Sequence, residues 1–392
     1  MNADLAFDRE SLLGVLGPAG QSLTLPGEAY TSPEVFAWER EHFFDQSWVC
    51  AGRASDLAPG DRAAAGVGSE GVLLTRDGRG TLHGFFNVCR HRGHELVQRG
   101  RAARAGVVQC PYHGWVYGLD GRLRGAPSMP DLDRDAFGLV PVRTGEWRGW
   151  AFVNVSGDAP PLGEHVGNLE ELVRDHEPER LVLAASIDYE VGANWKLVHE
   201  NYHECYHCSN IHPELCAVTP PESGRDFVPT GIWVGGSMDL RPHAATMSIS
   251  GESGATPLRG LDDRRRRQVL YFGLFPNLLI SLHPDYVVAY RIVPIDPGRS
   301  LVECWWLFSP EDVGRPGFDP AFAVDFWDLV NRQDWAAIES VQRGMASRGH
   351  RQGPLSAREA TVRDFETIVA RGYLSGGARA LTADGPFLSG QG

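Results

Sequence analysis

The sequence predicts an α+β protein in which a small all-β domain precedes a larger domain containing a sheet and a long helix. From Val49 to about Val155, short β-like runs alternate with Gly and Asp, which is typical of an antiparallel domain of roughly 110 residues. Farther along, strand-like runs over residues 269–308 precede an amphipathic helix over Asp319–Ser347. Strands followed by a long packing helix indicate an α+β domain with an antiparallel sheet. The 392 residues are enough for two such domains.

Local signals place the remaining elements. Ser32–Trp48 begins with the Ser, Pro, Glu order of a helix start, so a helix is predicted there. Gly157–Pro161 breaks the hydrophobic periodicity of both helices and strands, which indicates a domain boundary. Residues 219–265 are rich in Gly, Ser, Pro and Thr, so we expect pocket-covering loops there. The other predicted elements are helices over Leu162–Asp175 and Ser356–Ala370 and strands over Val182–Val191, Val269–Phe275, Leu278–Leu282, Tyr286–Pro294 and Leu301–Phe308.

Composition excludes several classes of protein. A formal net charge of −13 argues against a nucleic-acid partner. No apolar run reaches the roughly 18 residues of a membrane span, and the N-terminus lacks a basic-then-apolar signal pattern. Seven cysteines are too few and too unevenly spaced for a disulfide framework. We therefore expect a cytoplasmic protein without a membrane or nucleic-acid partner.

Two compact Cys/His pairs predict a metal site in the all-β domain. Cys89-x-His91 and Cys110-x₂-His113 each fall where a hairpin loop is expected, so two loops can close on one centre. Thiolates suit iron, and two imidazoles in place of two thiolates raise the reduction potential of an iron–sulfur cluster. The alternative is a Cys₂His₂ zinc site, although such sites usually pair Cys with Cys and His with His.

A second cluster lies in Asn194–Leu215, which contains four histidines and three carboxylates. It is predicted to be a helix with Asn194 as N-cap, and with Glu200, Glu204 and His207 on one face. The helix should end near Ser209–Asn210, because Pro213 disfavours a helical conformation at the residue before it. A helix end followed by a turn would bring His207 and His212 to one point.

Two histidines and one carboxylate form the facial triad of non-haem Fe(II) oxygenases. Asp334 lies on an apolar stripe of the predicted long helix, whereas three other charged residues lie off the stripe and should be solvated. A carboxylate buried among apolar side chains is costly unless it is paired or metal-bound, so Asp334 is a ligand or the partner of a buried Arg. The stripe consists of Trp327, Val330, Ile338, Val341 and Met345, and the residues off it are Asp328, Glu339 and Arg343.

These motifs resemble one known family. CRHRGHEL…CPYHGWVYGLDGRL is similar to the [2Fe–2S] domain of Rieske oxygenase α-subunits, the ring-hydroxylating family, and NWKLVHENYHECYHCSNIHPEL resembles its mononuclear-iron motif. The resemblance runs from about Phe36 to beyond Gly344. It implies a Rieske domain over 45–157, a helix-grip catalytic domain over 158–392, and an N-terminal helical segment over 1–44 that packs on the catalytic domain.

The resemblance also implies roles for individual residues. Cys89, His91, Cys110 and His113 would hold the Rieske cluster, and His207, His212 and Asp334 would hold a mononuclear Fe(II) that activates O₂. Glu204 would bridge to the second cluster histidine of a neighbouring subunit, within a homotrimer or a trimer-based hexamer. We expect Glu200 and His203 to be outer hydrogen-bond partners or solvated groups. Cys205, Cys208 and Cys216 are expected to be small buried hydrophobes.

The expected function is an oxygenase acting on a small organic substrate with O₂. Electrons from NAD(P)H would arrive through a separate flavin/iron–sulfur reductase or ferredoxin, because no G-x-G-x-x-G lies between a strand and a helix. The alternatives are a Rieske electron carrier and a zinc-stabilised binding protein. A respiratory membrane Rieske protein is disfavoured, because its extra cysteine pair and membrane anchor are missing.

The substrate is less constrained by the sequence. The iron motif is more similar to the glycine betaine, stachydrine and carnitine branch than to the naphthalene and biphenyl branch. It therefore favours hydroxylation or oxidative N-demethylation of a quaternary ammonium compound over hydroxylation of an aromatic ring. Aromatic side chains of the predicted strands could cage such a cation: Trp233, Tyr271, Phe272, Phe275, Tyr286, Tyr290, Trp305 and Trp306.

Overall fold

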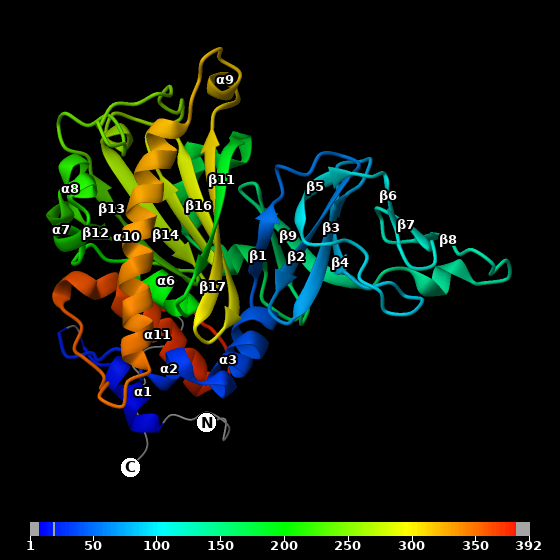
Figure 1. The fold of residues 1–392 in the computed structure, drawn as a ribbon, viewed down its shortest axis with the longest axis horizontal. Coiled ribbons are helices and arrows are strands. Elements are labelled where there is room, and N and C mark those ends of the chain that lie inside the picture. Colours follow the sequence, from blue (N-terminus) through cyan, green and yellow to red (C-terminus); the bar gives the residue numbers. More distant parts are fainter. Residues whose placement is uncertain (1–7, 19, 382–392) are drawn as a thin grey trace. The chain divides into compact units, whose positions relative to one another are not determined.

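The computed structural model describes residues 8–18 and 20–381. Phe44–Ala159 forms one unit of the chain, and the described residues up to Phe43 join those from Pro160 onward in the other (Figure 1). All strand pairings within both units are antiparallel. No helix among the described residues combines the length and apolar character that a membrane crossing requires.

The unit of residues 44–159 contains two sheets. A seven-stranded sheet has the order β1-β10-β9-β4-β3-β2-β5, and a three-stranded sheet has the order β6-β7-β8. The predicted all-β domain is therefore confirmed. Its strands are β1 (Val49–Arg53), β2 (Asp61–Val67), β3 (Glu70–Arg76), β4 (Leu82–Phe86), β5 (Gly100–Arg104), β6 (Val107–Gln109), β7 (Val116–Gly118), β8 (Leu123–Gly125), β9 (Pro141–Trp147) and β10 (Trp150–Asn154).

The other unit is built on a seven-stranded sheet with the order β11-β17-β16-β15-β14-β13-β12. The predicted strands from Val182 to Phe308 all occur, with ends that differ by no more than about two residues. Two strands were missed within the expected loops of residues 219–265: the two-residue β12, and β13, whose two glycines interrupt its β-like pattern. The strands are β11 (Val182–Val191), β12 (Arg225–Asp226), β13 (Trp233–Asp239), β14 (Gln268–Leu274), β15 (Leu278–Leu282), β16 (Val287–Asp296) and β17 (Arg299–Phe308).

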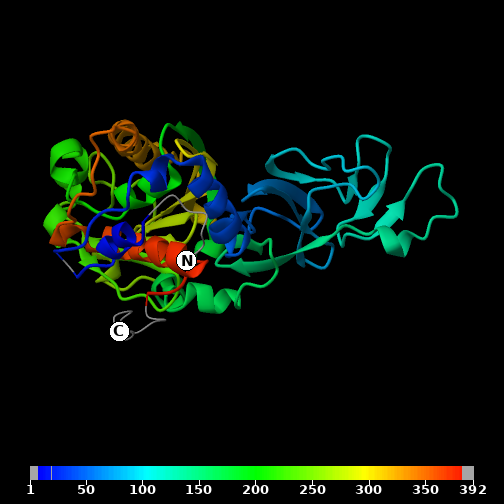
Figure 2. The ribbon, with the colours of Figure 1, turned by 90° about the horizontal axis from the view of Figure 1, so that it is seen from below.

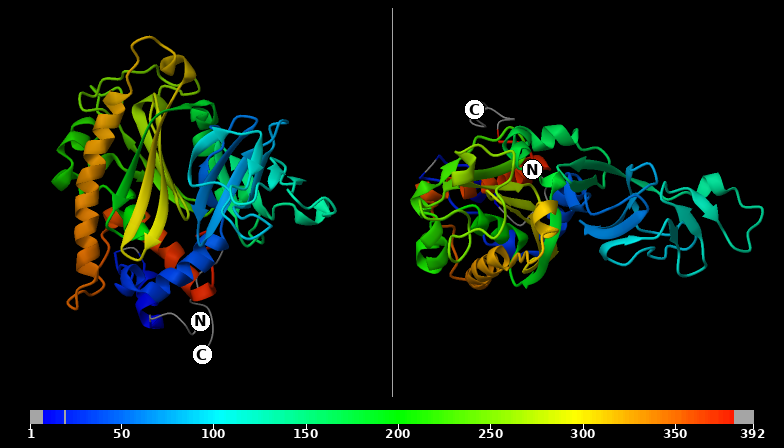
Figure 3. Two further views of the ribbon diagram at one scale, coloured as in Figure 1. Left: turned by 45° about the vertical axis from the view of Figure 1, so that its right-hand side comes forward. Right: turned by 90° about the horizontal axis from the view of Figure 1, so that it is seen from above.

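Helices cover this sheet. The long α10 runs beside the strands (Figures 1 and 3) and contacts α6, α8 and β11, whereas α11 packs against α1 and α6 (Figure 2). The helices are α1 (Arg9–Val15), α2 (Glu28–Thr31), α3 (Pro33–Glu39), α4 (Leu162–Val166), α5 (Leu169–Val173), α6 (Trp195–Tyr202), α7 (Cys208–Ile211), α8 (Pro213–Val218), α9 (Pro310–Val313), α10 (Ala321–Met345) and α11 (Ala360–Ser375).

Three helix predictions need correction. The helix expected over Ser32–Trp48 is α3 followed by a π-helical turn over Arg40–Asp45. The helix expected over Leu162–Asp175 divides into α4 and α5, because Gly167 ends α4 with a positive φ of 54°. The apolar stripe of α10 does not reach Val341, which is 42% exposed, since the last turns of α10 run past the end of the sheet (Figure 3).

Candidate metal centres

Two loops with the same backbone geometry carry the Cys/His pairs of the all-β unit. The Cys89 N–H donates to the carbonyl of His94 (2.8 Å), and the Gly93 N–H donates back to the carbonyl of Cys89 (3.0 Å). In the second loop, the Cys110 N–H donates to Trp115 (2.8 Å) and the Gly114 N–H to Cys110 (3.1 Å). Gly93 and Gly114 have φ of 73° and 71°, a conformation that side chains disfavour, so both turns need glycine.

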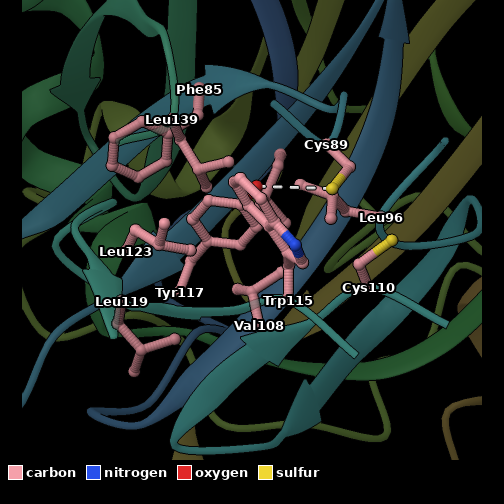
Figure 4. Close-up of a cluster of buried hydrophobic side chains, with 11 residues drawn as sticks. Phe85, Cys89, Leu96, Val108, Cys110, Trp115, Tyr117, Leu119, Leu123 and Leu139 are labelled. Atoms are coloured by element: carbon pink, nitrogen blue, oxygen red, sulfur yellow. Dashed lines mark hydrogen bonds between the residues drawn. The ribbon is translucent and has the colours of Figure 1, made fainter. Parts of the chain in front are cut away.

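The two loops place their ligands at different depths. Cys89 and Cys110 are only 3% and 2% exposed at the edge of a hydrophobic cluster, and Figure 4 shows both sulfurs on the same side of it. His91 is half-buried and His113 is exposed, with ring centroids 4.6 Å apart. Two buried thiols and two adjacent, more exposed imidazoles are a donor set that would hold a [2Fe–2S] cluster.

Neighbouring groups prepare these side chains for a cluster. Desolvation, together with the electrostatic influence of the neighbouring His91 and Arg92 side chains, lowers the pKa of His113 from its ordinary value, which favours the neutral imidazole that a metal requires. The Tyr117 hydroxyl lies 3.3 Å from the sulfur of Cys89 and accepts from the Arg90 N–H at 3.0 Å (Figure 4). A hydroxyl beside a cluster thiolate is a hydrogen-bond donor of the kind that tunes its potential.

The second candidate centre lies in the other unit, after α6. Asn194 caps this helix by accepting from the Lys196 N–H at 3.0 Å, as predicted. The predicted end near Ser209–Asn210 is wrong, because α6 stops at Tyr202. Beyond it the Glu204 carboxylate accepts hydrogen bonds from the N–H groups of Tyr206 and His207, which holds a non-helical turn before α7. Glu200 and Glu204 therefore do not share a helical face.

This turn brings the predicted ligands together. One donor atom from each of His207, His212 and Asp334 lies within 4.8 Å of the other two. Oδ1 of Asp334 is 2.8 Å from Nε2 of His212 and 3.4 Å from Nε2 of His207. The Asn201 amide donates to the same oxygen at 3.1 Å. Two imidazole nitrogens and one carboxylate oxygen converge, which suits a divalent transition metal with positions left open.

Each of these two histidines is also hydrogen-bonded through its other ring nitrogen, Nδ1. Nδ1 of His207 is hydrogen-bonded to the Glu204 carboxylate, and Nδ1–H of His212 donates to Oε1 of Gln333 at 2.6 Å. Such outer bonds fix the ring orientation and leave Nε2 for the metal. The role of Gln333 was not predicted, and the only signal for it in the sequence is its position next to Asp334.

The charges of the site favour a cation. Burial by itself would lower the pKa of His207, but the hydrogen bonds and charges of Asp334 and Glu204 outweigh it and raise this pKa to about 9. Burial likewise would raise the pKa of Asp334, and the two histidines reverse this and lower it from its ordinary value. The two carboxylates therefore favour a positive charge between them.

A pocket opens onto the three ligands. Of the eight aromatic residues predicted to form it, only Tyr271 lines it; the other seven lie outside it, mostly in the buried core. Trp327, predicted only as part of the α10 stripe, also lines the pocket, and its indole N–H donates to the Tyr286 hydroxyl at 3.0 Å. The other lining residues are Asn201, Tyr202, Glu204, Cys205, His207, Cys208, His212, Leu215, Met238, Met247, Val269, Ser281, Val330 and Asp334.

Several neighbours differ from expectation. Cys205 and Cys208 form a disulfide rather than serving only as small hydrophobes, while Cys216 is a partly buried free thiol. The Glu200 carboxylate accepts from the Tyr30 hydroxyl at 2.7 Å and does not line the pocket. His203 is buried, but neither of its ring nitrogens has a hydrogen-bond partner among the described residues.

Two of the residues expected to be solvated also have specific partners. Asp328 accepts from the Tyr189 hydroxyl at 2.8 Å, and Glu339 accepts from the Gly192 N–H at 3.0 Å. The first bond joins α10 to β11, and the second joins α10 to the residue that follows β11. Sequence periodicity could not reveal them, because they depend on which strand end lies opposite each turn of the helix.

Comparison with known proteins assigns the family. Residues 47–141 match the Rieske [2Fe–2S] domain, and residues 178–375 match the catalytic domain of the ring hydroxylating alpha subunit. The chain belongs to the ring-hydroxylating oxygenase α-subunits. The Rieske oxygenase is 30% identical to the glycine betaine monooxygenase oxygenase subunit of Chromohalobacter salexigens, over 98% of this chain and 92% of that protein.

Two further relatives support the same family assignment. The carnitine monooxygenase oxygenase subunit of Escherichia coli is 30% identical over 86% of this chain and 88% of its own length. The solved structure of CntA, a quaternary ammonium Rieske monooxygenase, is 27% identical with a TM-score of 0.80 over 94% of this chain and 99% of CntA. The cofactors are thus a Rieske [2Fe–2S] cluster and a mononuclear iron, with electrons from a separate reductase.

Proposed function

We propose that this Rieske oxygenase is a monooxygenase that hydroxylates a methyl group of a small quaternary ammonium substrate and so removes that group. The observation that carries the proposal is the convergence of His207, His212 and Asp334 on a pocket with an apolar and aromatic lining. The relatives that are glycine betaine and carnitine monooxygenase subunits support the substrate class.

We assign the metals to the residues that fit them. Cys89, His91, Cys110 and His113 hold the cluster, while His207, His212 and Asp334 hold the mononuclear iron. When bound, the cluster supplies single electrons and the iron activates O₂. The protein orients each imidazole so that Nε2 is left for the metal, through the hydrogen bonds of Glu204 to His207 and of Gln333 to His212. The Asn201 amide holds the shared carboxylate oxygen of Asp334 in place.

The pocket binds the substrate through apolar contact and cation–π attraction. Tyr271 and Trp327 present aromatic surface, and Met238 and Met247 present polarisable apolar surface. A quaternary ammonium carries no N–H to donate, so aromatic faces are its natural partners in a pocket. The hydrogen bond from Trp327 to Tyr286 fixes the indole ring and limits the entropy lost on binding.

The reaction that we propose for a substrate in this pocket is hydroxylation of one N-methyl group, followed by loss of that group. Hydroxylation of an N-methyl group consumes O₂, two electrons and two protons and releases water. The N-hydroxymethyl ammonium product then loses its hydroxyl proton and breaks its carbon–nitrogen bond, which gives formaldehyde, a tertiary amine and one proton. The Glu204 carboxylate is the charged group through which we propose that electrons arrive from the cluster histidine His113 of a neighbouring subunit in a homotrimer or trimer-based hexamer. A cytoplasmic location remains a prediction.

A substrate panel tests this function. The iron-loaded protein is supplied with a surrogate reductase, NADH and O₂, and offered quaternary ammonium compounds and simple arenes at equal concentration. We expect formaldehyde to be released in step with NADH consumption for at least one quaternary ammonium compound. Ring diols from the arenes, with no formaldehyde from any ammonium compound, would establish the alternative function of aromatic-ring hydroxylation.

A further inference from the structure

The disulfide between Cys205 and Cys208 encloses one of the proposed iron ligands. The Cα atoms of the two cysteines are 4.9 Å apart, and His207 lies between them in the sequence. A Cys-x-x-Cys pair is the spacing found in proteins that cycle between dithiol and disulfide. The five other cysteines, all among the described residues, form no disulfide.

Fold stabilisation does not account for this bond. In the chain-entropy description, a disulfide that closes four residues stabilises a fold less than one that closes a long loop. The loop is already held, because the Glu204 carboxylate binds the N–H groups of Tyr206 and His207 as well as the imidazole of His207. A chemical role is a better explanation of the pair.

The location of the pair indicates that role. Both cysteines line the pocket that contains the three proposed ligands. The sulfur of Cys208 is 4.0 Å from Nε2 of His207, the nitrogen that faces Asp334. Cys208 is only 3% exposed, whereas Cys205 is more open. The sulfur of Cys208 therefore lies within reach of a small oxidant that would form at the proposed iron position.

We propose that Cys205 and Cys208 form a redox couple that consumes hydrogen peroxide released in the pocket when O₂ is reduced without oxidation of substrate. Removal of peroxide at its source protects the neighbouring histidines from oxidation. The inference rests on the oxygen chemistry of the family and is independent of the substrate proposed above.

Hydrogen peroxide would oxidise the cysteine pair in two steps. The Cys208 thiolate attacks one peroxide oxygen, the O–O bond breaks, and a sulfenic acid forms with release of hydroxide, which is protonated to water. The Cys205 thiol then attacks that sulfur and displaces a second water, forming the disulfide. Two thiols and one hydrogen peroxide thus give one disulfide and two waters, and an external dithiol restores the thiols by exchange.

The test begins with iron-loaded full-length protein that has been reduced with dithiothreitol and desalted. One sample receives reductase, NADH, O₂ and excess catalase but no substrate, and another receives only stoichiometric hydrogen peroxide. After thiol alkylation and digestion, mass spectrometry measures the linked peptide. We expect the pair to be oxidised in both samples, at least tenfold faster than the Cys216 thiol. Catalase should not prevent oxidation in the first sample, because the peroxide reacts before it leaves the pocket.

Variants assign the order of the steps. Cys205→Ser should accumulate a sulfenic acid on Cys208 that dimedone traps, whereas Cys208→Ser should give no adduct on Cys205. Cys216→Ser is the matched control and should not change the rate at which the pair is oxidised.

The proposal is overturned if dithiothreitol cannot reduce the bond in folded protein. It is also overturned if both thiols survive while O₂ is consumed, or if added peroxide oxidises Cys216 equally fast. The sample with added peroxide needs no reductase, so failed electron supply is distinguishable from failure of the proposal.

Discussion

At the residue scale, the two proposed iron-binding histidines differ in what holds them from behind. His207 is bonded to a carboxylate, that of Glu204, whereas His212 is bonded to the uncharged amide of Gln333. A charged partner makes an imidazole a stronger donor than a neutral partner does. The two Fe–N bonds should therefore differ in strength, with that of His207 the stronger.

The three ligand assignments are tested one by one. We expect His207→Ala, His212→Ala and Asp334→Ala each to empty the mononuclear site, because two remaining ligands hold Fe(II) weakly. Turnover should fall by more than the roughly 10–100-fold typical of losing an outer hydrogen-bond partner. Iron analysis and the visible spectrum check this, since the cluster should stay intact.

Asp328→Ala is the matched control, because Asp328 lies on the same helix but bonds Tyr189. It should keep both its iron and its activity. Normal iron content in Asp334→Ala would show that the ligand set is wrong. Glu204, the other carboxylate that lines the pocket, would then replace Asp334 in the assignment.

A separate prediction concerns the role of Glu204 in electron transfer. We expect Glu204→Gln to retain both metal centres, because an amide oxygen can still accept from His207, but to slow electron transfer to the iron by orders of magnitude through loss of the charge. Single-turnover kinetics of pre-reduced protein with substrate and O₂ measure this step. The exposed Glu222→Gln is the control and should reoxidise like the parent. Unchanged reoxidation in Glu204→Gln would remove this residue from the electron path.

At the scale of single elements, the start of α6 was predictable and its end was not. The start of α6 depends on Asn194 and its bond to Lys196, both local in sequence. The end at Tyr202 depends on the side chain of Glu204, which binds the turn that follows, and periodicity does not report such a bond. Both ends of α10 were predicted to within two residues, but the apolar stripe predicted for this helix included the exposed Val341.

The inner side of α6 carries a buried acid that makes stability depend on pH. The Tyr30 hydroxyl lies 2.7 Å from Glu200 and 3.5 Å from Glu366, and burial raises the pKa of Glu200 to about 8. A carboxyl group with a raised pKa in the folded state is neutral there while the unfolded chain has already ionised. Its contribution to stability is therefore complete below about pH 4.5 and is lost as the pH rises to about 8.

This dependence can be measured on one variant. Glu200→Gln keeps a neutral group in the same place, so its free energy of unfolding should fall less between pH 5 and pH 8 than that of the parent. The difference should approach about 1.4 kcal/mol per pH unit across the steep part of the transition. Urea unfolding at both pH values measures it, with Glu222→Gln as an exposed control. Parallel pH profiles for parent and Glu200→Gln would contradict the assignment.

At the scale of the whole molecule, the order of the two motifs was enough to predict two domains and two metal centres. Cys89 to His113 and His207 to His212 are each close in sequence, so their chemistry is visible in spacing alone. The pocket was not predictable in the same way. Met238, Met247 and Trp327 come from segments far apart in the sequence, and the aromatic strand residues mostly turned inward to the core. The disulfide was missed because Cys205 and Cys208 were interpreted by their burial.

The central claim is that this chain carries a Rieske cluster together with a mononuclear iron, and iron and sulfide analysis combined with EPR tests it most directly. The isolated protein should be brown, with about three iron atoms and two sulfide ions per chain and a Rieske EPR signal. Cys89→Ser or His113→Ala should remove the colour. A colourless protein that holds stoichiometric zinc, without iron or sulfide, would contradict the claim.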